Sequence, residues 1–400
     1  MKNRFWCLII CVLSLVLILP TTTMAAGKPD KIHVAAIGDF SGPYAPVVGS
    51  HSPGAKDAWK YFNEEKGGVK GVEVVPLLRD TGGKVALGLT MYNELINMKP
   101  KPLFIDTSLT PLGEALRPRL VEDGIVGIHA GALVSVYPLG NSYAYYPMYD
   151  EWMAVALDWV KKTWKGKGNP RVGILTWDTG YGRAILTDHG LAYFKKAGVD
   201  MAGKVQVFGI RDVDVTTQLM QLRAAKADYI YTNTTAGGPL AIRKGCMEMG
   251  WDVPLIAGGL DYGTLKLNPP AFEGQLIPRP WVSWHEGDNP SVKFMLEQMK
   301  KNNRTEREKS AFYFVGWMCA AAQYRAMNQV VEKYGWEGLN AKNLKAELNT
   351  IENWQPFGGM TTVTYTAKRP VPRGVRMFQV KGGKILPIDE WQVAPNFLPE

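Results

Sequence analysis

Cysteine and histidine are scarce in this sequence, with 4 Cys and 5 His among 400 residues. Cys7 and Cys11 lie in the apolar N-terminal stretch, which leaves only Cys246 and Cys319 for the rest of the chain. Two cysteines cannot frame a disulfide-rich fold, and we expect these two to lie in different lobes and to stay unpaired. The histidines show no spacing typical of a metal site.

Sequence motifs of common enzymes are also missing. Beyond the N-terminal stretch there is no HExxH, GxxxxGK[ST], CxxC or GxSxG sequence. Residues 67–71 are rich in glycine, but they end a predicted helix, whereas a dinucleotide-binding turn opens one. We therefore expect no enzyme, no metal and no cofactor. A catalytic triad dispersed along the chain stays open as an alternative.

Only the first 26 residues contain a long apolar run. Lys2 and Arg4 precede an apolar stretch at residues 6–20, and small residues that end in Ala25 and Ala26 follow it. This pattern is typical of a cleavable export signal. A run of about 15 residues is shorter than the roughly 20 that a transmembrane helix needs. We predict that residues 1–26 are a signal peptide and that the protein works in the periplasm.

The excess of basic residues is not concentrated on any segment. The formal net charge is +9, and Lys2 and Arg4 would leave with the signal peptide. The remaining basic residues are scattered, with short clusters at 161–167 and 300–307 that are typical of solvated surface. A nucleic-acid partner is not expected, because there is no basic stripe and no recognition motif.

Short apolar runs alternate with amphipathic stretches over much of the chain. Residues 32–38 and 171–176 are typical of strands, and residues 53–66 carry apolar side chains at helical spacing. Such alternation predicts the α/β class, with parallel sheets covered by helices, and the number of repeats fits two sheets better than one. We also expect one helix over 183–196 and β-structure over 361–387, with a hairpin turn at Gly382-Gly383.

This alternation ends near Gly259, and long helices follow, among them one predicted over 311–333. Helices that come after a complete α/β set indicate that the chain returns to its first lobe. We place the first lobe at residues 27–149 plus 283–357 and the second at residues 150–282 plus 358–400. Short direct segments must then join the lobes, and such segments make good hinges.

Loops that follow the predicted strands carry polar and aromatic residues. In open α/β sheets, ligands bind beyond the carboxyl ends of the strands. Hydroxyl groups and free backbone N–H groups at the start of a helix suit a carboxylate. The loops with this character are residues 39–44, 106–110, 129–132, 177–182 and 258–262. Their recurrence in both halves of the chain favours a cleft for a small ligand.

These segments, in their order, resemble periplasmic solute-binding proteins of the branched-chain amino acid type. The loop Ser41-Gly42-Pro43, the pair Gly54-Ala55 and residues 63–71 match the opening of that family, and residues 178–183 match a turn in its second lobe. The resemblance implies the type I periplasmic binding fold, with two Rossmann-like lobes and parallel sheets joined by a three-crossover hinge. It also implies a monomer that delivers a ligand to the permease subunits of an ABC transporter in the membrane.

The resemblance also implies a set of ligand-binding residues. It suggests that hydroxyls of the first lobe hold a carboxylate, that backbone groups of the next loop and an acidic side chain hold an ammonium, and that aromatic rings enclose the body of the ligand. In that order the residues are Thr107, Ser108 and Thr110; Ala130, Gly131, Ala132 and Asp261; and Tyr181 and Phe312. We expect Trp281 and Tyr44 to enclose the body of the ligand as well.

The ligand class is left open by one departure from the family pattern. Leu133 stands where relatives carry a threonine that contacts the ammonium, which weakens the case for an α-amino acid. We expect an amino acid or a related carboxylate as the ligand. The alternatives are an aromatic or dicarboxylic acid without an amino group, and a role as the ligand-binding partner of a sensor rather than of a transporter.

Overall fold

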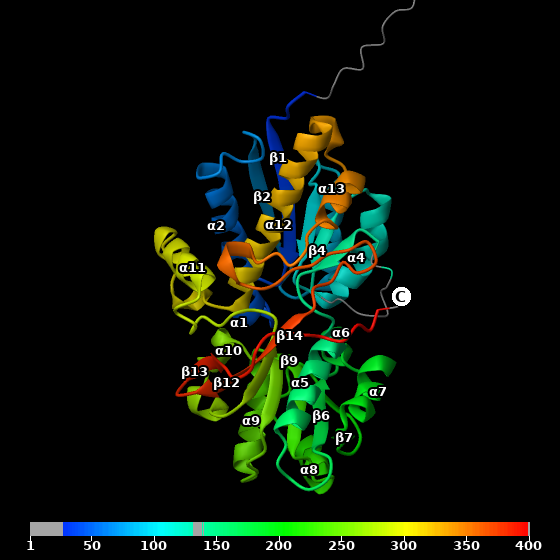
Figure 1. Ribbon diagram of the computed structural model, residues 1–400, viewed down its shortest axis with the longest axis vertical. Helices are drawn as coiled ribbons and strands as arrows, with labels where there is room; N and C mark the ends of the chain where they lie inside the picture. The colour runs from blue at the N-terminus through cyan, green and yellow to red at the C-terminus, as the bar shows by residue number, and fades with distance from the viewer. Residues whose placement is uncertain (1–26, 131–137, 139, 399–400) are drawn as a thin grey trace, which may run out of the picture.

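The computed structural model describes residues 27–130, 138 and 140–398. The expected signal peptide, residues 1–26, lies outside the described residues, as do Gly131, Ala132 and Leu133. The chain forms two lobes, each built around its own sheet (Figure 1). In the described part, no helix is long and apolar enough to cross a membrane.

The first lobe contains a parallel sheet in the order β2-β1-β3-β4-β5. Along β1, Ile32 and Val34 face one apolar cluster, and Ala35 and Ile37 face another, as the period of two in a strand requires. The strands are β1 (Lys31–Gly38), β2 (Glu73–Asp80), β3 (Phe104–Thr107), β4 (Gly127–His129) and β5 (Ser142–Ala144). Both faces of this sheet are therefore buried, which explains its nearly continuous apolar sequences.

Helices from both ends of the chain cover the first sheet. They are α1 (Ala45–Val48), α2 (His51–Glu64), α3 (Val85–Ile96), α4 (Thr110–Glu122), α11 (Pro290–Lys301), α12 (Ala311–Tyr334) and α13 (Ala341–Leu348). The return of α12 to this lobe, beside α2, follows the expectation from the sequence (Figure 1).

The second lobe contains a mixed sheet in the order β13-β12-β11-β10-β9-β6-β7, with β8 paired to β6 and β14 to β12. The strands are β6 (Arg171–Trp177), β7 (Asp200–Met201), β8 (Gln206–Phe208), β9 (Tyr229–Thr235), β10 (Leu255–Gly259), β11 (Leu276–Arg279), β12 (Gly374–Lys381), β13 (Lys384–Pro387) and β14 (Gln392–Val393). The hairpin turn at Gly382-Gly383 is confirmed, and both glycines have positive φ. This antiparallel end means that the sheet is not wholly parallel.

Helices again cover both faces of the second sheet. They are α5 (Tyr149–Thr163), α6 (Gly180–Arg183), α7 (Asp188–Ala197), α8 (Thr216–Ala224), α9 (Gly237–Glu248) and α10 (Tyr262–Leu265). Val172 and Ile174 of β6 join the apolar cluster that contains α5, and Leu175 and Trp177 join the cluster that contains α8 and α9.

The expected single helix over 183–196 is wrong, because the chain forms α6 and α7 with a break between them. Thr187 causes the break: its hydroxyl accepts a hydrogen bond from the Gly190 N–H at 2.9 Å, which caps α7. The same hydroxyl donates to Asp150 Oδ2 at 2.5 Å, which ties the cap to α5.

In the described part of the chain, three crossovers connect the lobes, between β5 and α5, between β11 and α11, and between α13 and β12. They are tied to one another: the Ala144 N–H donates to Pro370 O at 2.9 Å, and the Val282 N–H donates to Met360 O at 3.1 Å. Residues 361–373 form part of this third crossover instead of the expected strand, because the Val363 and Tyr365 N–H groups donate to Trp354 O and Ile351 O of the same crossover rather than to a strand of the sheet. We propose the lobe boundaries given above, which these crossovers suit.

Buried polar groups fix the carboxyl ends of β3 and β4. Asp106 accepts from the Ile128 N–H at 2.9 Å and from Gln323 Nε2 of α12 at 2.6 Å. The Thr107 N–H donates to His129 Nδ1 at 3.2 Å. Burial raises the pKa of Asp106 to about 7 and lowers the pKa of His129 to about 3. The two strand ends, and the loops that leave them, are held together by these contacts.

The two cysteines of the described chain are unpaired, as expected. Cys246 belongs to the apolar cluster around α8 and α9 in the second lobe, and Cys319 lies on α12 in the first.

Because α2 packs closely against α12 at Gly316, we predict that the stability of the fold depends on glycine at this position. A Cβ at Gly316 would lie 2.5 Å from Ala55 N and 2.7 Å from His51 O. Gly316→Ala should therefore lower the free energy of unfolding by about 1–3 kcal/mol, since overpacking outweighs the better helix propensity of alanine. Chemical denaturation measures this. Gly237→Ala, where a Cβ meets nothing within 4 Å, is the control, and equal effects of the two changes would contradict the packing.

The buried His129 predicts a pH-dependent contribution to stability. In the native protein the ring stays neutral down to about pH 3, whereas in the unfolded chain it protonates below about pH 6.5. The unfolded state then binds more protons, so this contribution declines as the pH falls through that window. His129→Asn keeps an acceptor for the Thr107 N–H but removes the titration.

We expect the stability difference between the wild type and His129→Asn to narrow as the pH falls from 7 to 4.5, measured by thermal unfolding. Burial lowers the pKa of His51 to about 4, so His51 affects the pH dependence of stability in the same direction as His129, whereas the raised pKa of Asp106 affects it in the opposite direction. Both residues are present in the wild type and in the variant, so the difference between the two proteins reports on His129. A difference that stays constant over this range would contradict the role of His129.

Candidate functional site

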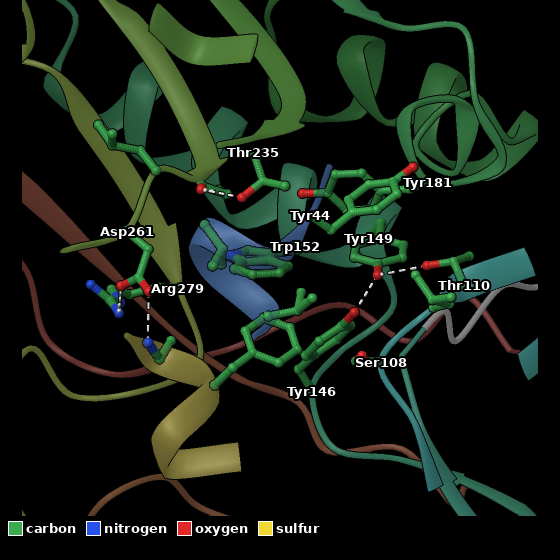
Figure 2. A pocket seen from close by; sticks show the side chains of 18 of the residues that line it. Tyr44, Ser108, Thr110, Tyr146, Tyr149, Trp152, Tyr181, Thr235, Asp261 and Arg279 are labelled. Carbon is green, nitrogen blue, oxygen red and sulfur yellow. Dashed lines mark hydrogen bonds and ion pairs between the residues drawn. The ribbon is translucent and has the colours of Figure 1, made fainter. Parts of the chain in front are cut away.

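A cleft between the lobes brings together the loops that follow several strands. It encloses about 700 Å³ of space free of protein atoms, part of it open to solvent. Its lining residues are Tyr44, Val47, Val48, Ser108, Leu109, Thr110, Pro111, Tyr146, Tyr149, Trp152, Tyr181, Thr235, Gly258, Gly259, Leu260, Asp261, Arg279, Trp281, Ala311 and Phe312 (Figure 2). This is the edge at which an open α/β sheet binds its ligand.

The first-lobe end of the cleft is rich in hydroxyl groups. Ser108 is 6% exposed, and its Oγ has no hydrogen-bond partner among the described residues. Thr110 follows at the start of α4, and its Oγ1 lies 3.2 Å from the Tyr149 hydroxyl. Because the helix N-terminus carries partial positive charge and α4 has no side-chain cap, this end of the cleft favours a negatively charged group.

Two residues expected in the site, Thr107 and Ala130, do not line the cleft. Thr107 is fully buried, and its Oγ1 accepts from the Leu109 N–H at 3.1 Å, so the hydroxyl shapes the turn before α4. The Ala130 N–H donates to Thr107 O at 2.9 Å. Both residues therefore support the loop that presents Ser108.

Aromatic rings form the walls of the cleft. Tyr149 lies nearly parallel to Trp152, with ring centres 6.3 Å apart, and meets Tyr181 edge-on at 5.1 Å. The hydroxyls of Tyr146 and Tyr149 are hydrogen bonded to each other. Burial raises the pKa of Tyr146 and of Tyr181 well above 10, so both phenols keep their protons. The walls suit a flat apolar body.

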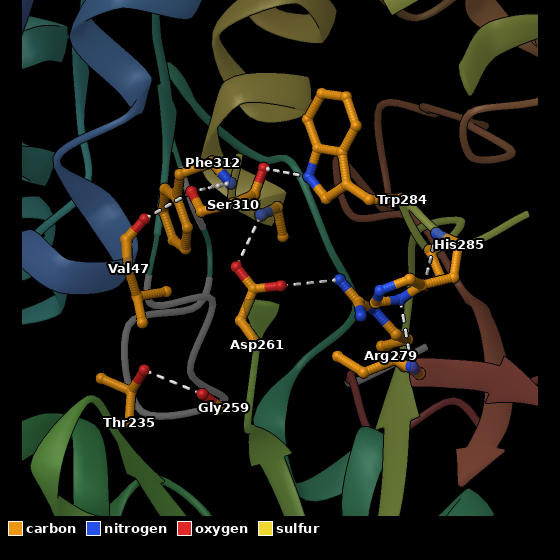
Figure 3. A network of polar contacts seen from close by, with 12 residues as sticks. Val47, Thr235, Gly259, Asp261, Arg279, Trp284, His285, Ser310 and Phe312 are labelled. Carbon is orange, nitrogen blue, oxygen red and sulfur yellow. Dashed lines mark hydrogen bonds and ion pairs between the residues drawn. The ribbon is translucent and has the colours of Figure 1, made fainter. Parts of the chain in front are cut away.

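Asp261 of the second lobe is fully engaged with protein groups. Its Oδ1 accepts from Arg279 Nη2 at 3.1 Å, and its Oδ2 accepts from the Ala311 N–H at 2.6 Å (Figure 3). Ala311 is the first residue of α12, so this carboxylate spans the cleft to the helix N-terminus of the other lobe. The side chains of Asp261 and Arg279 are about 5% and 4% exposed.

This arrangement differs from the expectation that Asp261 binds a ligand ammonium. Its charge is already balanced by Arg279, and both its oxygens already accept hydrogen bonds. Asp261 and Arg279 are also the charged side chains that line the described cleft, and together they are neutral. No unpaired carboxylate is left there, within the described residues, for a cationic ligand.

Further hydrogen bonds fix the start of α12, where Asp261 makes its contact. Ser310, the residue before α12, donates its hydroxyl to Val47 O at 2.7 Å and accepts at its carbonyl oxygen from Trp284 Nε1 at 3.0 Å (Figure 3). Farther out, Glu306 of the first lobe accepts from the Tyr262 hydroxyl and pairs with Lys266 at 3.5 Å. The lobes thus contact each other directly around the cleft.

Several lining residues were not identified from the sequence. Tyr146, Tyr149 and Trp152 belong to an aromatic-rich stretch that is equally typical of a core. Arg279 stands between two prolines and gave no signal, since its role depends on β11 lying beside β10. Of the expected residues, the cleft is lined by Tyr44, Ser108, Thr110, Tyr181, Asp261, Trp281 and Phe312.

The described residues contain no group of three or more His, Cys, Asp or Glu side chains placed to hold a metal ion. The cleft offers hydroxyl donors and a helix N-terminus at one end, aromatic walls, and a neutral ion pair at the other end. A mostly apolar cleft with few, well-placed polar groups is typical of a small-molecule binding site.

Comparisons with known proteins agree with this geometry. Residues 31–384 match the sequence pattern of the periplasmic binding protein family. No curated protein sequence matches the chain. Among solved structures, the chain is similar to a branched-chain amino acid ABC transporter from Thermus thermophilus with bound valine, at a TM-score of 0.81 and 19% identity over 91% of this chain and 97% of that one.

Two further structures are similar over nearly the same length. One is a fatty acid ABC transporter substrate-binding protein from Thermomonospora curvata, with a TM-score of 0.80 and 18% identity, covering 92% of this chain and 94% of that one. The other is a solute-binding protein of an ABC transporter from Rhodopseudomonas palustris in complex with p-hydroxybenzoic acid, with a TM-score of 0.76 and 21% identity, covering 92% and 98%.

At these identities the structural likeness shows the fold, and it confirms the predicted α/β architecture of two lobes. The sequence match spans most of the chain. The protein therefore belongs to the periplasmic binding protein family.

Proposed function

We propose that this protein is an exported solute-binding protein that captures an aromatic carboxylate between its lobes and delivers it to an ABC importer. The observation that carries the proposal is the aromatic lining of a cleft whose first-lobe end presents hydroxyls at a helix start. Residues 1–26 would direct its export to the periplasm. One chain supplies both walls of the cleft, so a monomer is sufficient.

The carboxylate is assigned to Ser108 and Thr110. The Ser108 Oγ is buried without a partner among the described residues, and a carboxylate would accept its hydrogen bond. The similar structures do not share one ligand, since their names record valine, a fatty acid and p-hydroxybenzoic acid. What these share is a carboxylate joined to an apolar body.

Two features favour an aromatic acid over an α-amino acid. The lobe-two carboxylate that would hold an ammonium, Asp261, is neutralised by Arg279. The walls between the two polar ends are rings, among them Tyr146, Trp152 and Trp281, which suit a planar body. Of the ligand classes expected from the sequence, the cleft thus supports acids without an amino group.

A ligand panel tests the proposal. The mature chain, unfolded and refolded to remove any carried ligand, should show a raised melting temperature with benzoate-type acids. Ligand at 100 times its dissociation constant adds about 2.7 kcal/mol of stability. Leucine and valine should give no shift. A shift with these amino acids and none with aromatic acids would contradict the proposal.

Two serine variants test whether the Ser108 hydroxyl contacts the ligand. Ser108→Ala should weaken the binding of 4-hydroxybenzoate by about 10- to 150-fold, because a hydrogen bond to a charged group contributes about 1.5–3 kcal/mol. Ser142→Ala is the matched control: Ser142 Oγ is also buried without a described partner, but it lies on β5 and does not line the cleft. Calorimetric titration gives both affinities. Equal losses in the two variants would mean that Ser108 does not contact the ligand.

A further inference from the structure

The second-lobe end of the cleft gathers hydrogen-bond donors from two separate elements. A Cβ at Gly258 would lie 3.5 Å from Cε2 of Trp152 and 3.6 Å from the carbonyl oxygen of Pro278. Cε2 is bonded to the indole nitrogen, and Pro278 directly precedes Arg279. The indole of Trp152 on α5 therefore lies near the backbone that carries Arg279 at the end of β11, and both side chains line the cleft (Figure 2).

Trp152 brings a donor that the described protein leaves unused. Its side chain is 6% exposed, and Nε1 has no hydrogen-bond partner among the described residues. An indole N–H can only donate. Buried donors without a partner are rare in native proteins, so each such group calls for an explanation. An acceptor atom of a ligand at this end of the cleft would provide one.

Arg279 adds further donors at the same end. The residue is 3% exposed, and its hydrogen bond to a described residue is the one from Nη2 to Asp261. Nε and Nη1 donate to no described residue. A guanidinium carries five N–H groups and no acceptor. Because Arg279 lines the cleft as Trp152 does, it adds donors that the Asp261 carboxylate does not occupy.

The charge at this end decides which acceptor fits. Arg279 and Asp261 cancel, so a cation meets no net negative charge here, and both oxygens of Asp261 already accept hydrogen bonds from protein groups. A second carboxylate would lie close to the carboxylate of Asp261, and like charges in a buried site repel. A neutral oxygen meets neither penalty.

We infer that Trp152 and Arg279 form a subsite for a neutral oxygen acceptor, a carbonyl or hydroxyl at the end of the ligand away from its carboxylate. The inference rests on the proposed binding of an aromatic acid and narrows its substrate class. The ligand then has one polar end for each lobe, so both lobes bind it only when the cleft is closed. In this subsite the protein donates and the ligand accepts, whereas an ammonium at the same place would need acceptors from the protein.

A series of benzoates that differ at the para position tests the subsite in the wild-type protein. The probes are 4-acetylbenzoate, 4-methylbenzoate, 4-(aminomethyl)benzoate and terephthalate, measured by calorimetric titration. We expect 4-acetylbenzoate to bind at least about ten-fold more tightly than 4-methylbenzoate, which corresponds to about 1.4 kcal/mol. The aminomethyl compound and terephthalate should bind more weakly than 4-acetylbenzoate.

The outcomes separate this inference from the proposed function. Equal affinities for the acetyl and methyl compounds, or tightest binding of the aminomethyl compound, would overturn the subsite but leave the aromatic acid assignment standing. Tightest binding of terephthalate would also overturn the neutral oxygen. Binding of no benzoate would overturn the proposed function and this inference together.

Three variants test whether the preference depends on the indole N–H of Trp152 and on Arg279. Trp152→Phe should reduce the preference for 4-acetylbenzoate over 4-methylbenzoate by about five-fold or more. Trp164→Phe, which removes another buried and unpartnered indole N–H outside the cleft, should leave the preference unchanged. Arg279→Lys, which keeps the positive charge beside Asp261 but has fewer fixed donors, should also reduce it. An unchanged preference in both Trp152→Phe and Arg279→Lys would overturn the assignment.

Discussion

The buried carboxylate of Asp261 is the contact on which the arrangement of the cleft depends. It starts from the second lobe, pairs with Arg279 of the same lobe, and accepts a hydrogen bond from the first residue of α12 in the other lobe. Breaking a buried pair by removing one partner costs about 3–5 kcal/mol, because a charge is left without compensation. The pair therefore keeps Asp261 from serving as a counter-ion for a ligand, and it aims the carboxylate at the N-terminus of α12.

Ligand capture follows from this geometry in a simple way. The lobes already contact each other through Asp261 and, farther out, through Glu306 with Tyr262 and Lys266. A ligand shifts such an equilibrium only by its differential affinity for the closed form. Because the two lobes already contact each other without a ligand, the ligand has to supply less of the free energy that closes the cleft. The crossovers, tied together by backbone hydrogen bonds at Ala144 and Val282, are the segments about which the lobes can turn.

Much of the fold was predictable because it depends on local patterns. Period-two burial in β1, apolar spacing in α2 and the glycine pair at 382–383 each act within a few residues. The loops that build the cleft were also predictable, since the carboxyl ends of parallel strands share one edge. The break between α6 and α7 was not, because the hydroxyl of Thr187 caps α7 and binds a distant aspartate.

The roles of single site residues were harder to predict. Thr107 has the hydroxyl expected of a ligand contact, but a turn uses it. Asp261 was correctly placed at the cleft, yet its partner Arg279 comes from another strand and has no sequence signature. Trp152 lies on a helix where an apolar ring is ordinary, and only its position beside Gly258 distinguishes it. Such roles depend on which elements meet in three dimensions.

The most direct test is to identify the molecule that the protein carries in the cell. The protein would be recovered from cells without ligand removal and denatured, and the released compound would be identified by mass spectrometry. The account predicts an aromatic acid with a neutral oxygen away from its carboxylate. Release of valine, leucine or another α-amino acid in stoichiometric amount would contradict it.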